Sequence, residues 1–329
     1  MLPRSLLERL ADGREHSRTE LRESLELDAD ALAEQIEQLR ATGLEVVAGA
    51  DDGIRLREPI DWIDPAGIES RLSADHRQRV ESLEHAFEIE STNRHLLDGR
   101  PPAPAMARIA VAEYQTAGRG RRGRSWTMPP GTGVALSASW QFGPEHGGLE
   151  ALSLAVGAVA RRAVRDVTRL EIGLKWPNDL LVDGAKLGGI LVELTPLADG
   201  ACHAVVGIGI NVSVPAAFLA RASDLPQGAC DLATAAPHWP VDRAALAARL
   251  IEQLIELFMG FPARGFEPYR PEWLAAHVLN GRPVEMSTQS GTAFGRVVDV
   301  AADGALIIEH ESGERRRLIS GDVTIRAGR

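Results

Sequence analysis

The feature that most constrains this chain is an apolar strand that runs straight into a loop of alternating glycine and arginine. The strand covers residues 109–112, and the loop residues are Gly118, Arg119, Gly120, Arg121, Arg122, Gly123 and Arg124. Glycine lets backbone N–H groups approach an anion closely, and guanidinium forks match phosphate or carboxylate oxygens in pairs. In a chain of net charge −10, we expect this loop to bind a nucleotide or an acyl phosphate. A mobile, solvated basic loop is the alternative.

The glycine spacing of this loop also matches the dinucleotide-binding fingerprint, and we reject that match. The fingerprint requires a helix that begins at the loop and holds a pyrophosphate at its N-terminus. Here the chain continues through Met128, Pro129, Pro130 and Gly131, which cannot be helical. The loop is therefore expected to bind an anion in another way.

Lysine is almost absent from the chain. Of 36 basic residues only Lys175 and Lys186 are lysine, and both lie in one span of twelve residues. A lysine ammonium is a compact point charge with three rotatable donors, which suits a crowded reacting centre better than a planar guanidinium does. We expect this span to hold reacting groups, with a structural pair or chance clustering as the alternative.

The length of 329 residues, 44% of them hydrophobic, suffices for two or three ordinary domains. Charged residues interrupt the amino terminus, and no apolar run approaches the roughly 18 residues that span a bilayer. Cys202 and Cys230 have no metal-type spacing, so we expect neither a protein-held metal nor a disulfide framework. These features predict a soluble protein without a membrane segment, cytoplasmic by default.

Residues 1–60 predict three short helices followed by a hairpin. Ser17 and Asp28 are suited to cap the second and third helices. Two short strands at 44–47 and 54–56 would form a wing. This order resembles a winged helix-turn-helix domain.

The charge of these residues argues against the DNA binding that such a fold suggests. The third helix of the fold enters the major groove, where basic side chains neutralise phosphates. Residues 1–60 instead carry fourteen acidic residues against eight arginines, and the third helix offers Asp28, Asp30, Glu34 and Glu37 before its first base, Arg40. A winged helix kept for packing or dimerisation is therefore the alternative.

Residues 61–79 predict a linker that becomes helical, and residues 80–277 predict a central domain. A half-buried strand at 87–90 precedes Ser91, Thr92 and Asn93, which can cap a short helix or bind a polar head group. Further strands are expected at 133–140, 190–194 and 205–212, and buried helices at 152–164 and 244–258.

Three local patterns refine this domain. A turn at Asp183-Gly184 should bring the two lysines near one another. Gly207 and Gly209 leave room for a ligand or for close packing. Residues 213–240, rich in Ala, Pro and Ser, are expected to form a surface excursion.

Residues 278–329 predict a separate, all-β domain. Five short strands are expected at 283–286, 293–300, 306–309, 317–319 and 323–325. So many strands in about fifty residues indicate a small barrel of SH3-like type.

Taken together, the motifs resemble those of the bifunctional bacterial biotin protein ligases, which also repress the biotin operon. The matching segments are Ser91-Thr92-Asn93, Glu113-Tyr114-Gln115, residues 118–124 with Trp126, Lys175-Trp176-Pro177-Asn178-Asp179, residues 186–193 and residues 207–211. The resemblance covers nearly the whole chain. It implies an α+β protein whose central domain is a class II synthetase-like mixed sheet with helices.

The resemblance also implies a reaction and its participants. Biotin and ATP would give biotinyl-5'-adenylate, and biotin would then pass to a lysine of the biotin carboxyl carrier protein of acetyl-CoA carboxylase. Mg²⁺ would arrive on the ATP phosphates rather than in a site made by the protein alone. The resemblance also implies that the protein forms a homodimer when the adenylate binds. Biotin operator DNA is a further implied partner, although the acidic charge of the third helix opposes it.

By matching motif positions, the resemblance assigns roles to individual residues. Lys186 would bridge the biotin carboxylate and the α-phosphate, and it would share the chemistry with Arg119, Arg121 and Asp179. The biotin site would comprise Ser91, Thr92, Asn93, Gln115, Gly118, Lys186, Gly188 and Gly189. The nucleotide site would comprise Arg119, Gly120, Arg121, Arg124, Trp126, Lys175, Asn178, Asn211 and Arg326.

Two other functions compete with this one. The first is a metabolite-sensing repressor without ligase activity, which the acidic N-terminal domain disfavours. The second is a lipoate ligase, which the paired lysines and the arginine loop disfavour.

Overall fold

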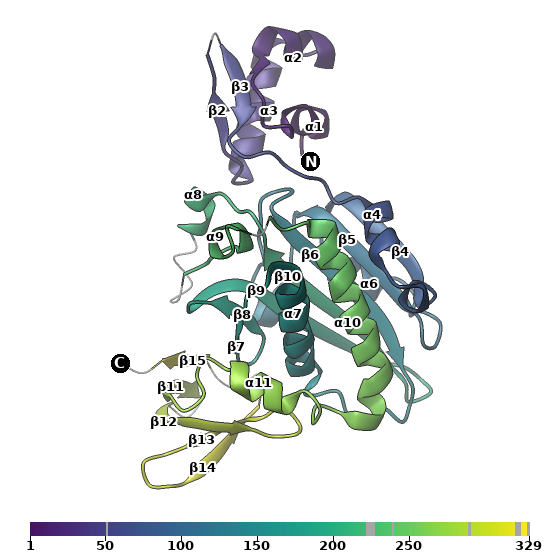
Figure 1. Ribbon diagram of the computed structural model, residues 1–329, viewed down its shortest axis with the longest axis vertical. Coiled ribbons are helices and arrows are strands. Elements are labelled where there is room, and N and C mark those ends of the chain that lie inside the picture. Colours follow the sequence, from purple (N-terminus) through teal and green to yellow (C-terminus); the bar gives the residue numbers. More distant parts are fainter. Residues whose placement is uncertain (51, 222–227, 239, 289–290, 320–323, 328–329) are drawn as a thin grey trace.

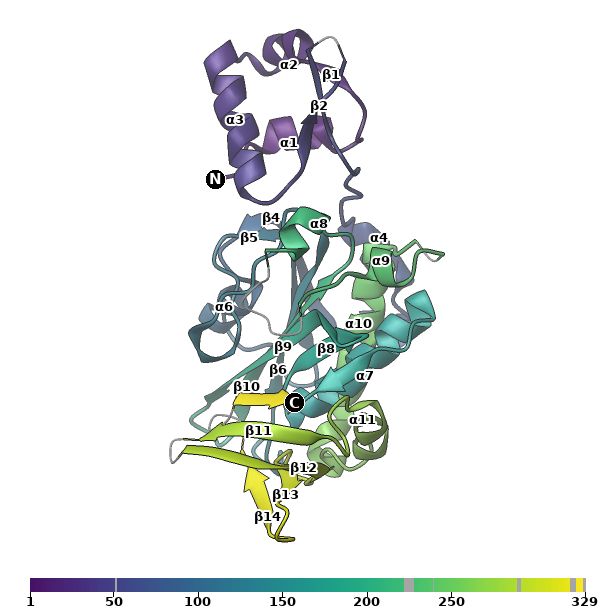
Figure 2. The same ribbon diagram turned by 90° about the vertical axis from the view of Figure 1, so that its left-hand side faces the viewer.

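The computed structural model describes the whole chain except residues 51, 222–227, 239, 289–290, 320–323 and 328–329. Of residues 286–293 and 324–327 no side chain is described. Figure 1 and Figure 2 show three parts in chain order, with the N-terminal helices and the C-terminal strands at opposite ends of a central sheet. The predicted order of the three parts is confirmed.

The N-terminal part has the helices and hairpin that the sequence predicts. Ser17 accepts a hydrogen bond from the backbone N of Thr19 at 3.2 Å, and Asp28 accepts one from Ala31 at 2.8 Å, so both predicted caps are confirmed. The wing strands pair antiparallel and a short third strand joins them. The elements are α1 (Arg4–Leu10), β1 (His16–Ser17), α2 (Arg18–Leu25), α3 (Ala29–Ala41), β2 (Val46–Ala48) and β3 (Gly53–Leu56).

The segment after the wing is helical and belongs to the central core. It forms α4 (Pro65–Arg71) and α5 (Ala74–Arg77). Ile68 and Leu72 are buried in the same apolar cluster as the central sheet. The predicted segment 61–79 does become helical, and it packs on the central body.

The central sheet has seven strands in the order β4-β5-β6-β10-β9-β8-β7. The pair β4–β5 is parallel and the other pairs are antiparallel, so the sheet is mixed. Its strands are β4 (Val80–Ile89), β5 (Ala107–Gln115), β6 (Gly133–Phe142), β7 (Gly173–Lys175), β8 (Asp179–Val182), β9 (Ala185–Pro196) and β10 (Cys202–Asn211).

Helices cover one face of this sheet, and a single short helix covers part of the other. Figure 1 shows α7 (Leu152–Thr168) and α10 (Arg243–Arg264) side by side on the first face. Helix α10 includes the buried helix predicted at 244–258, and its leucines, among them Leu250 and Leu254, are fully buried there. The second face carries α6 (Thr92–Asp98), which contacts β5, β6 and β10. This division leaves the rest of the second face available for a site.

The segment predicted as a surface excursion carries α8 (Ala216–Leu219) and α9 (Leu232–Ala235). Helix α11 (Arg270–Ala276) then leads to the C-terminal strands. These form one antiparallel sheet in the order β14-β13-β12-β11-β15, which confirms a small all-β domain. Its strands are β11 (Pro283–Thr288), β12 (Gly291–Val300), β13 (Leu306–Glu309), β14 (Arg315–Leu318) and β15 (Thr324–Ala327).

In the described part of the chain, none of the helices combines the length and apolar character that crossing a bilayer requires. Both cysteines are free thiols.

Candidate functional site

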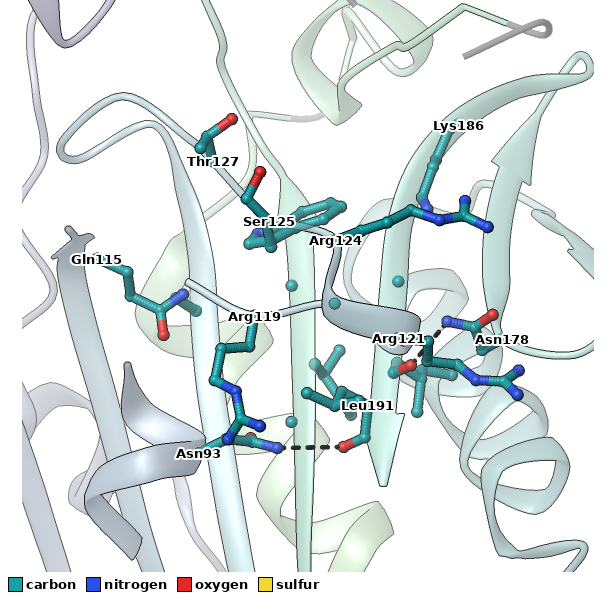
Figure 3. A pocket seen from close by; sticks show the side chains of 18 of the residues that line it. Asn93, Gln115, Arg119, Arg121, Arg124, Ser125, Thr127, Asn178, Lys186 and Leu191 are labelled. Carbon is teal, nitrogen blue, oxygen red and sulfur yellow. Dashed lines mark hydrogen bonds between the residues drawn. The ribbon is translucent and has the colours of Figure 1, made fainter. Parts of the chain in front are cut away.

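A cavity of about 690 Å³ lies on the second face of the central sheet, beneath the arginine loop. Its walls come from the start of α6, the loop between β5 and β6, the turn between β7 and β8, and the excursion that carries α8. Figure 3 shows side chains from these elements converging over the strands. The loop, the lysine span and the Ser-Thr-Asn segment, far apart in the sequence, therefore meet at one site.

The floor of the cavity follows from strand alternation. Along β10 the even-numbered residues enter the apolar core with α7 and α10, so the odd-numbered ones face the cavity. The strand register then sets three rows across β6, β10 and β9. The rows are Ala135, Gly209 and Gly189, then Ser137, Gly207 and Leu191, then Ser139, Val205 and Glu193.

The two glycines of β10 are needed for close packing. A Cβ on Gly207 would lie 2.1 Å from Oδ1 of Asn93, and one on Gly209 would lie 2.5 Å from the Trp126 ring. Of the two alternatives that the sequence left open, close packing is therefore the observed one. The packed side chains themselves line the cavity.

The arginine loop is closed by its own backbone. Gly120 N donates to Arg124 O at 2.7 Å, and Trp126 N donates to Gly118 O at 2.8 Å. A Cβ on Gly118 would lie 2.3 Å from Trp126 O, so only glycine fits there. The loop contains one short 3₁₀ turn, Arg121–Gly123, and no α-helix, as the rejection of the dinucleotide fingerprint requires.

A buried ion pair fixes both ends of this loop. Glu113, near the end of β5, is paired with Arg243 of α10 at 2.5 Å, and both side chains are almost fully buried. Arg243 also donates to Gly133 O, where β6 begins, at 2.9 Å, and to Asp61 O at 2.8 Å. The loop therefore starts and ends on rigid supports.

Lys186 forms one end of the cavity, which we call the lysine end. Its Nζ lies 2.7 Å from Oδ1 of Asp179 and 5.8 Å from the centre of the Trp126 ring. Its backbone N donates to Gly228 O at 3.0 Å, and its backbone O accepts from Cys230 N at 2.9 Å. The excursion thus holds the backbone of this lysine in place.

The predicted turn between the two lysines is confirmed. Asp183 and Gly184 have φ angles of 48° and 84° and connect β8 to β9. Lys175 is partly buried, and burial lowers its pKa, with Lys186 among the cations that lower it further. Burial also lowers the pKa of Arg121, as do the neighbouring Arg122 and Arg124. Both pKa values are lowered because several cations lie close together in a partly desolvated site.

The turn that follows Lys175 is clamped from behind. Nε2 of the buried His277 accepts from Trp176 N at 3.3 Å, and Trp176 Nε1 donates to Gly304 O of the C-terminal domain at 2.9 Å. Asn178 Nδ2 donates to Ile190 O at 2.8 Å, a bond drawn in Figure 3. The turn therefore has fixed partners in β9 and in the C-terminal domain.

The opposite end of the cavity, which we call the hydroxyl end, is a chain of hydrogen bonds. Gln115 Oε1 accepts from Thr92 N at 2.8 Å and from Thr92 Oγ1 at 3.1 Å. Ser137 Oγ lies 2.7 Å from Thr92 Oγ1 and 2.6 Å from Oδ1 of Asn93. Ser91 caps α6 by accepting from Arg94 N at 3.4 Å, yet it also lines the cavity.

Asn93 has its amide engaged on both sides. Its Nδ2 donates to Glu193 Oε2 at 3.0 Å and to Leu191 O at 3.4 Å, and its Oδ1 accepts from Ser137. The same Glu193 is paired through Oε1 with Nη1 of Arg119 at 3.0 Å. Figure 3 shows the Arg119 side chain directed toward Asn93, away from Lys186.

Most of the residues singled out from the sequence lie together. The cavity is lined by Ser91, Thr92, Asn93, Gln115, Arg119, Gly120, Arg121, Arg124, Trp126, Asn178, Lys186, Gly189 and Asn211. Asp179 contacts Lys186, and Gly118 packs on Trp126. Gly188 is not among the lining residues. A Cβ added to Gly188 would lie 2.4 Å from Gly209 O, so this glycine serves close packing rather than the cavity. Arg326 lies in β15, and its side chain is outside the described residues.

Sequence reasoning missed two contributions. Phe218, Leu219 and Arg221 of the excursion line the cavity, although their composition suggested only surface. Glu193 ends the matching segment 186–193, but no role was assigned to it from the sequence. Its alternation with Gly189 and Leu191 along β9 is the signal that places it on the same face of the sheet as those two residues.

This arrangement suits the joining of two anions. Lys186 and Arg121 lie near the same carboxylate, Asp179, and further guanidiniums of the loop line the cavity. Fixed cations lower the repulsion between two acids brought together, and a partly dry site strengthens that effect. Among the described residues no group of three or more His, Cys, Asp or Glu side chains is placed to hold a metal ion.

The chain is similar to known proteins over its whole length. Residues 87–211 match the Biotin/lipoate A/B protein ligase family, and residues 280–326 match the Biotin protein ligase C terminal domain. The Bifunctional ligase/repressor BirA of Salmonella typhimurium is 34% identical and that of Escherichia coli 33% identical, each covering 99% of this chain and 98% of the relative. The Biotin--[acetyl-CoA-carboxylase] ligase of Paracoccus denitrificans is 32% identical, covering 69% of this chain and 93% of that protein.

A solved structure gives the same likeness in three dimensions. The Biotin protein ligase from Aquifex aeolicus in complex with biotin and ATP aligns with a TM-score of 0.62 at 25% identity. The alignment covers 75% of this chain and 100% of that one.

Proposed function

The chain belongs to the biotin protein ligase family, and from that premise we propose that biotin and ATP are joined in the cavity beneath the arginine loop. The enzyme is a biotin–[acetyl-CoA-carboxylase] ligase. The carboxylate of biotin attacks the α-phosphorus of ATP, which gives biotinyl-5'-adenylate and releases pyrophosphate. An amine of the carrier protein then attacks the acyl carbon, an amide forms, and AMP leaves.

The observation that carries this proposal is the lysine end of the cavity. Lys186 Nζ lies 2.7 Å from Asp179, and its backbone is fixed by hydrogen bonds to the excursion. A lysine held in this way can lie between a carboxylate and a phosphate, where it offsets the repulsion of both. Arg121 and Arg124 would share the phosphate charge.

The hydroxyl end would hold the ureido head of biotin. Ser91, Thr92 and Gln115 offer hydroxyl and amide groups there, within a floor of small and apolar side chains. The amide of Asn93 is engaged by Ser137, Leu191 and Glu193, so we assign it the role of bracing α6 rather than of contacting biotin.

The nucleotide would lie against Trp126. Its indole Nε1 is buried and has no hydrogen-bond partner among the described residues, as would fit an acceptor on the ligand. Cover by this ring would keep water from the reactive anhydride. Asn178 and Asn211 would support the nucleotide site indirectly. Their Nδ2 atoms donate hydrogen bonds to Ile190 O and Cys230 O, and so hold the backbone around the site.

Lys175 and Asp179 would act on the reacting groups through charge. Asp179 lies between Lys186 and the partly buried Lys175 and Arg121. Mg²⁺ would enter on the ATP phosphates and neutralise part of their charge. Its protein oxygens would have to come from this carboxylate and from Asn178.

Transfer to the carrier protein is the direct test. Purified protein would be incubated with radiolabelled biotin, ATP and the carrier domain of acetyl-CoA carboxylase, with lipoate as the matched acid. We expect ATP-dependent label on the carrier from biotin and none from lipoate. Label from lipoate alone would point to a lipoate ligase, and binding of biotin without transfer would point to a sensor that does no chemistry.

Repression of the biotin operon is a second candidate function, because the relatives that cover the whole chain are named ligase/repressors. The winged-helix elements are present, but α3 exposes acidic side chains. Association into a homodimer on adenylate binding belongs to the same candidate. Sedimentation with and without biotinyl-adenylate tests that association.

A further inference from the structure

We propose that Glu193 is a positioning residue of the biotinylation reaction, because it binds Arg119 and thereby holds the arginine loop closed over the hydroxyl end of the cavity. This inference rests on the proposed function and names a residue that does not itself line the cavity. Glu193 would act on retention of the ligand, not on the joining of biotin to phosphate.

The position of Glu193 follows from the strand register. It lies in the third floor row, opposite Val205, one row beyond Leu191 and Gly207. Val205 is buried under α6 with Leu96. Glu193 therefore stands where the open floor ends and the covered part of the sheet begins.

The carboxylate of Glu193 joins two elements that the sequence keeps far apart. Oε1 pairs with Nη1 of Arg119 in the loop at 3.0 Å, and Oε2 accepts from Nδ2 of Asn93 in α6 at 3.0 Å. The Glu193 side chain is 20% exposed and the Arg119 side chain 42% exposed. One carboxylate thus ties the loop to both the sheet and the short helix, and each oxygen has a single partner.

Arg119 is suited to transmit this hold to the rest of the loop. It lies between Gly118 and Gly120, whose backbones make the hydrogen bonds that close the loop, and it forms a β-bridge with Ser125. Ser125 precedes Trp126, whose ring covers Gly209. A displaced Arg119 would therefore loosen the segment that carries Trp126.

The distance from the reacting centre separates this role from phosphate binding. Glu193 lies seven residues beyond Lys186 along β9, which corresponds to roughly 23 Å at about 3.3 Å per residue. While paired with Glu193, Arg119 is thus at the far end of the cavity from Lys186. Loss of the Glu193–Arg119 pair should therefore raise the KM for biotin and the rate of biotin release more than it lowers kcat.

The substitution Glu193→Gln isolates the ion pair. A glutamine keeps an oxygen that can accept from Asn93 but removes the charge that holds Arg119. We expect biotin and biotinyl-adenylate to dissociate about fivefold faster, as suits a partly exposed pair. The measurement is stopped-flow dissociation followed by Trp fluorescence or by displacement of radiolabelled biotin.

A matched control comes from the same helix. Arg94 and Asp98 of α6 form an exposed ion pair at 2.7 Å that does not reach the cavity. Asp98→Asn should leave the dissociation rate and the transfer rate unchanged. Glu193→Asp, which keeps the charge on a shorter side chain, should recover part of the retention.

A double-mutant cycle with Arg119→Gln keeps the inference testable if Glu193→Gln folds poorly. If the two residues act through each other, the double variant should release biotin no faster than the faster single variant. Unchanged dissociation in the folded Glu193 and Arg119 variants, or fully additive effects, would overturn the inference. If the variants give these results but the parent protein still transfers biotin, the proposed function stands and only the role of Glu193 is wrong. If the parent protein binds no biotin, the proposed function itself is wrong.

Discussion

The arginine loop and helix α3 are two surfaces on which this chain could receive an anion, and they are built with opposite charge. The loop places its guanidiniums around a cavity that also holds Lys186, with Asp179 and Glu193 as the carboxylates in contact with them. Helix α3 exposes Asp30, Glu34 and Glu37. The comparison shows that charge, rather than fold, separates a site equipped for a nucleotide from a helix poorly equipped for DNA.

The single basic residue of α3 strengthens the contrast. Arg40 pairs with Glu37 at 2.6 Å and donates to Val46 O at 2.8 Å. Its guanidinium thus anchors the helix to the wing. A phosphate that approached this face would have to compete with both partners.

The largest expected effect concerns the charge of the lysine end. Lys186→Ala should lower biotin-dependent exchange of pyrophosphate into ATP by about a thousandfold or more, because the carboxylate and the phosphate would meet without the cation between them. Lys186→Arg, as control, keeps the charge with a different shape and should retain more activity. Exchange near the parent rate in the alanine variant would remove the lysine from the mechanism.

The next effect concerns the support behind the lysine end, which we expect to weaken in acid. His277, behind Trp176, has its pKa lowered to about 4 by burial, with Lys175 adding to the effect. Because the folded pKa lies below the ordinary value of about 6.5, its contribution to stability is present above pH 6.5. That contribution is lost as the pH falls toward 4, by about 3 kcal/mol in all.

Thermal unfolding between pH 7 and pH 4 checks this expectation. His277→Gln keeps an acceptor for Trp176 N without the titration, so its stability should vary less with pH over that window. Equal slopes for the parent and the glutamine variant would contradict the assignment.

The smallest effect concerns helix α3. Glu34→Gln combined with Glu37→Gln removes two exposed charges and releases Arg40 from its partner. Non-specific DNA binding at low salt should strengthen by about tenfold or less, since each removed charge lowers the repulsion only modestly. Ligase activity should not change.

Mobility-shift titration at two salt concentrations measures this difference. Tight and biotin-dependent binding of operator DNA by the parent protein would contradict this expectation, because an acidic α3 would then recognise DNA through other contacts. Binding that is weak in the parent and salt-sensitive in the variant would support it.

Local sequence patterns predicted much of this structure correctly. We could predict the caps at Ser17 and Asp28, the turn at Asp183-Gly184 and the buried helix at 244–258, because each depends on neighbouring residues. The three-part architecture followed from them and is confirmed. The candidate site residues were predicted by motif resemblance rather than by periodicity.

The features that could not be predicted depend on contacts between segments that lie far apart in the sequence. Glu193 and Arg119 are 74 positions apart, and the alternation along β9 that sets the face of Glu193 does not predict which loop lies over it. The excursion was expected at the surface, yet its backbone holds Lys186. Neither relation leaves a local signal in the sequence.

A crystal structure with biotinyl-5'-adenylate bound is the most direct test of the central claim, that fixed cations at the lysine end join biotin to ATP. We expect the phosphate to contact Lys186 and Arg121, and the ureido head to lie against Ser91, Thr92 and Gln115. A ligand bound elsewhere, or a phosphate in the cavity with Lys186 still paired only to Asp179, would contradict it.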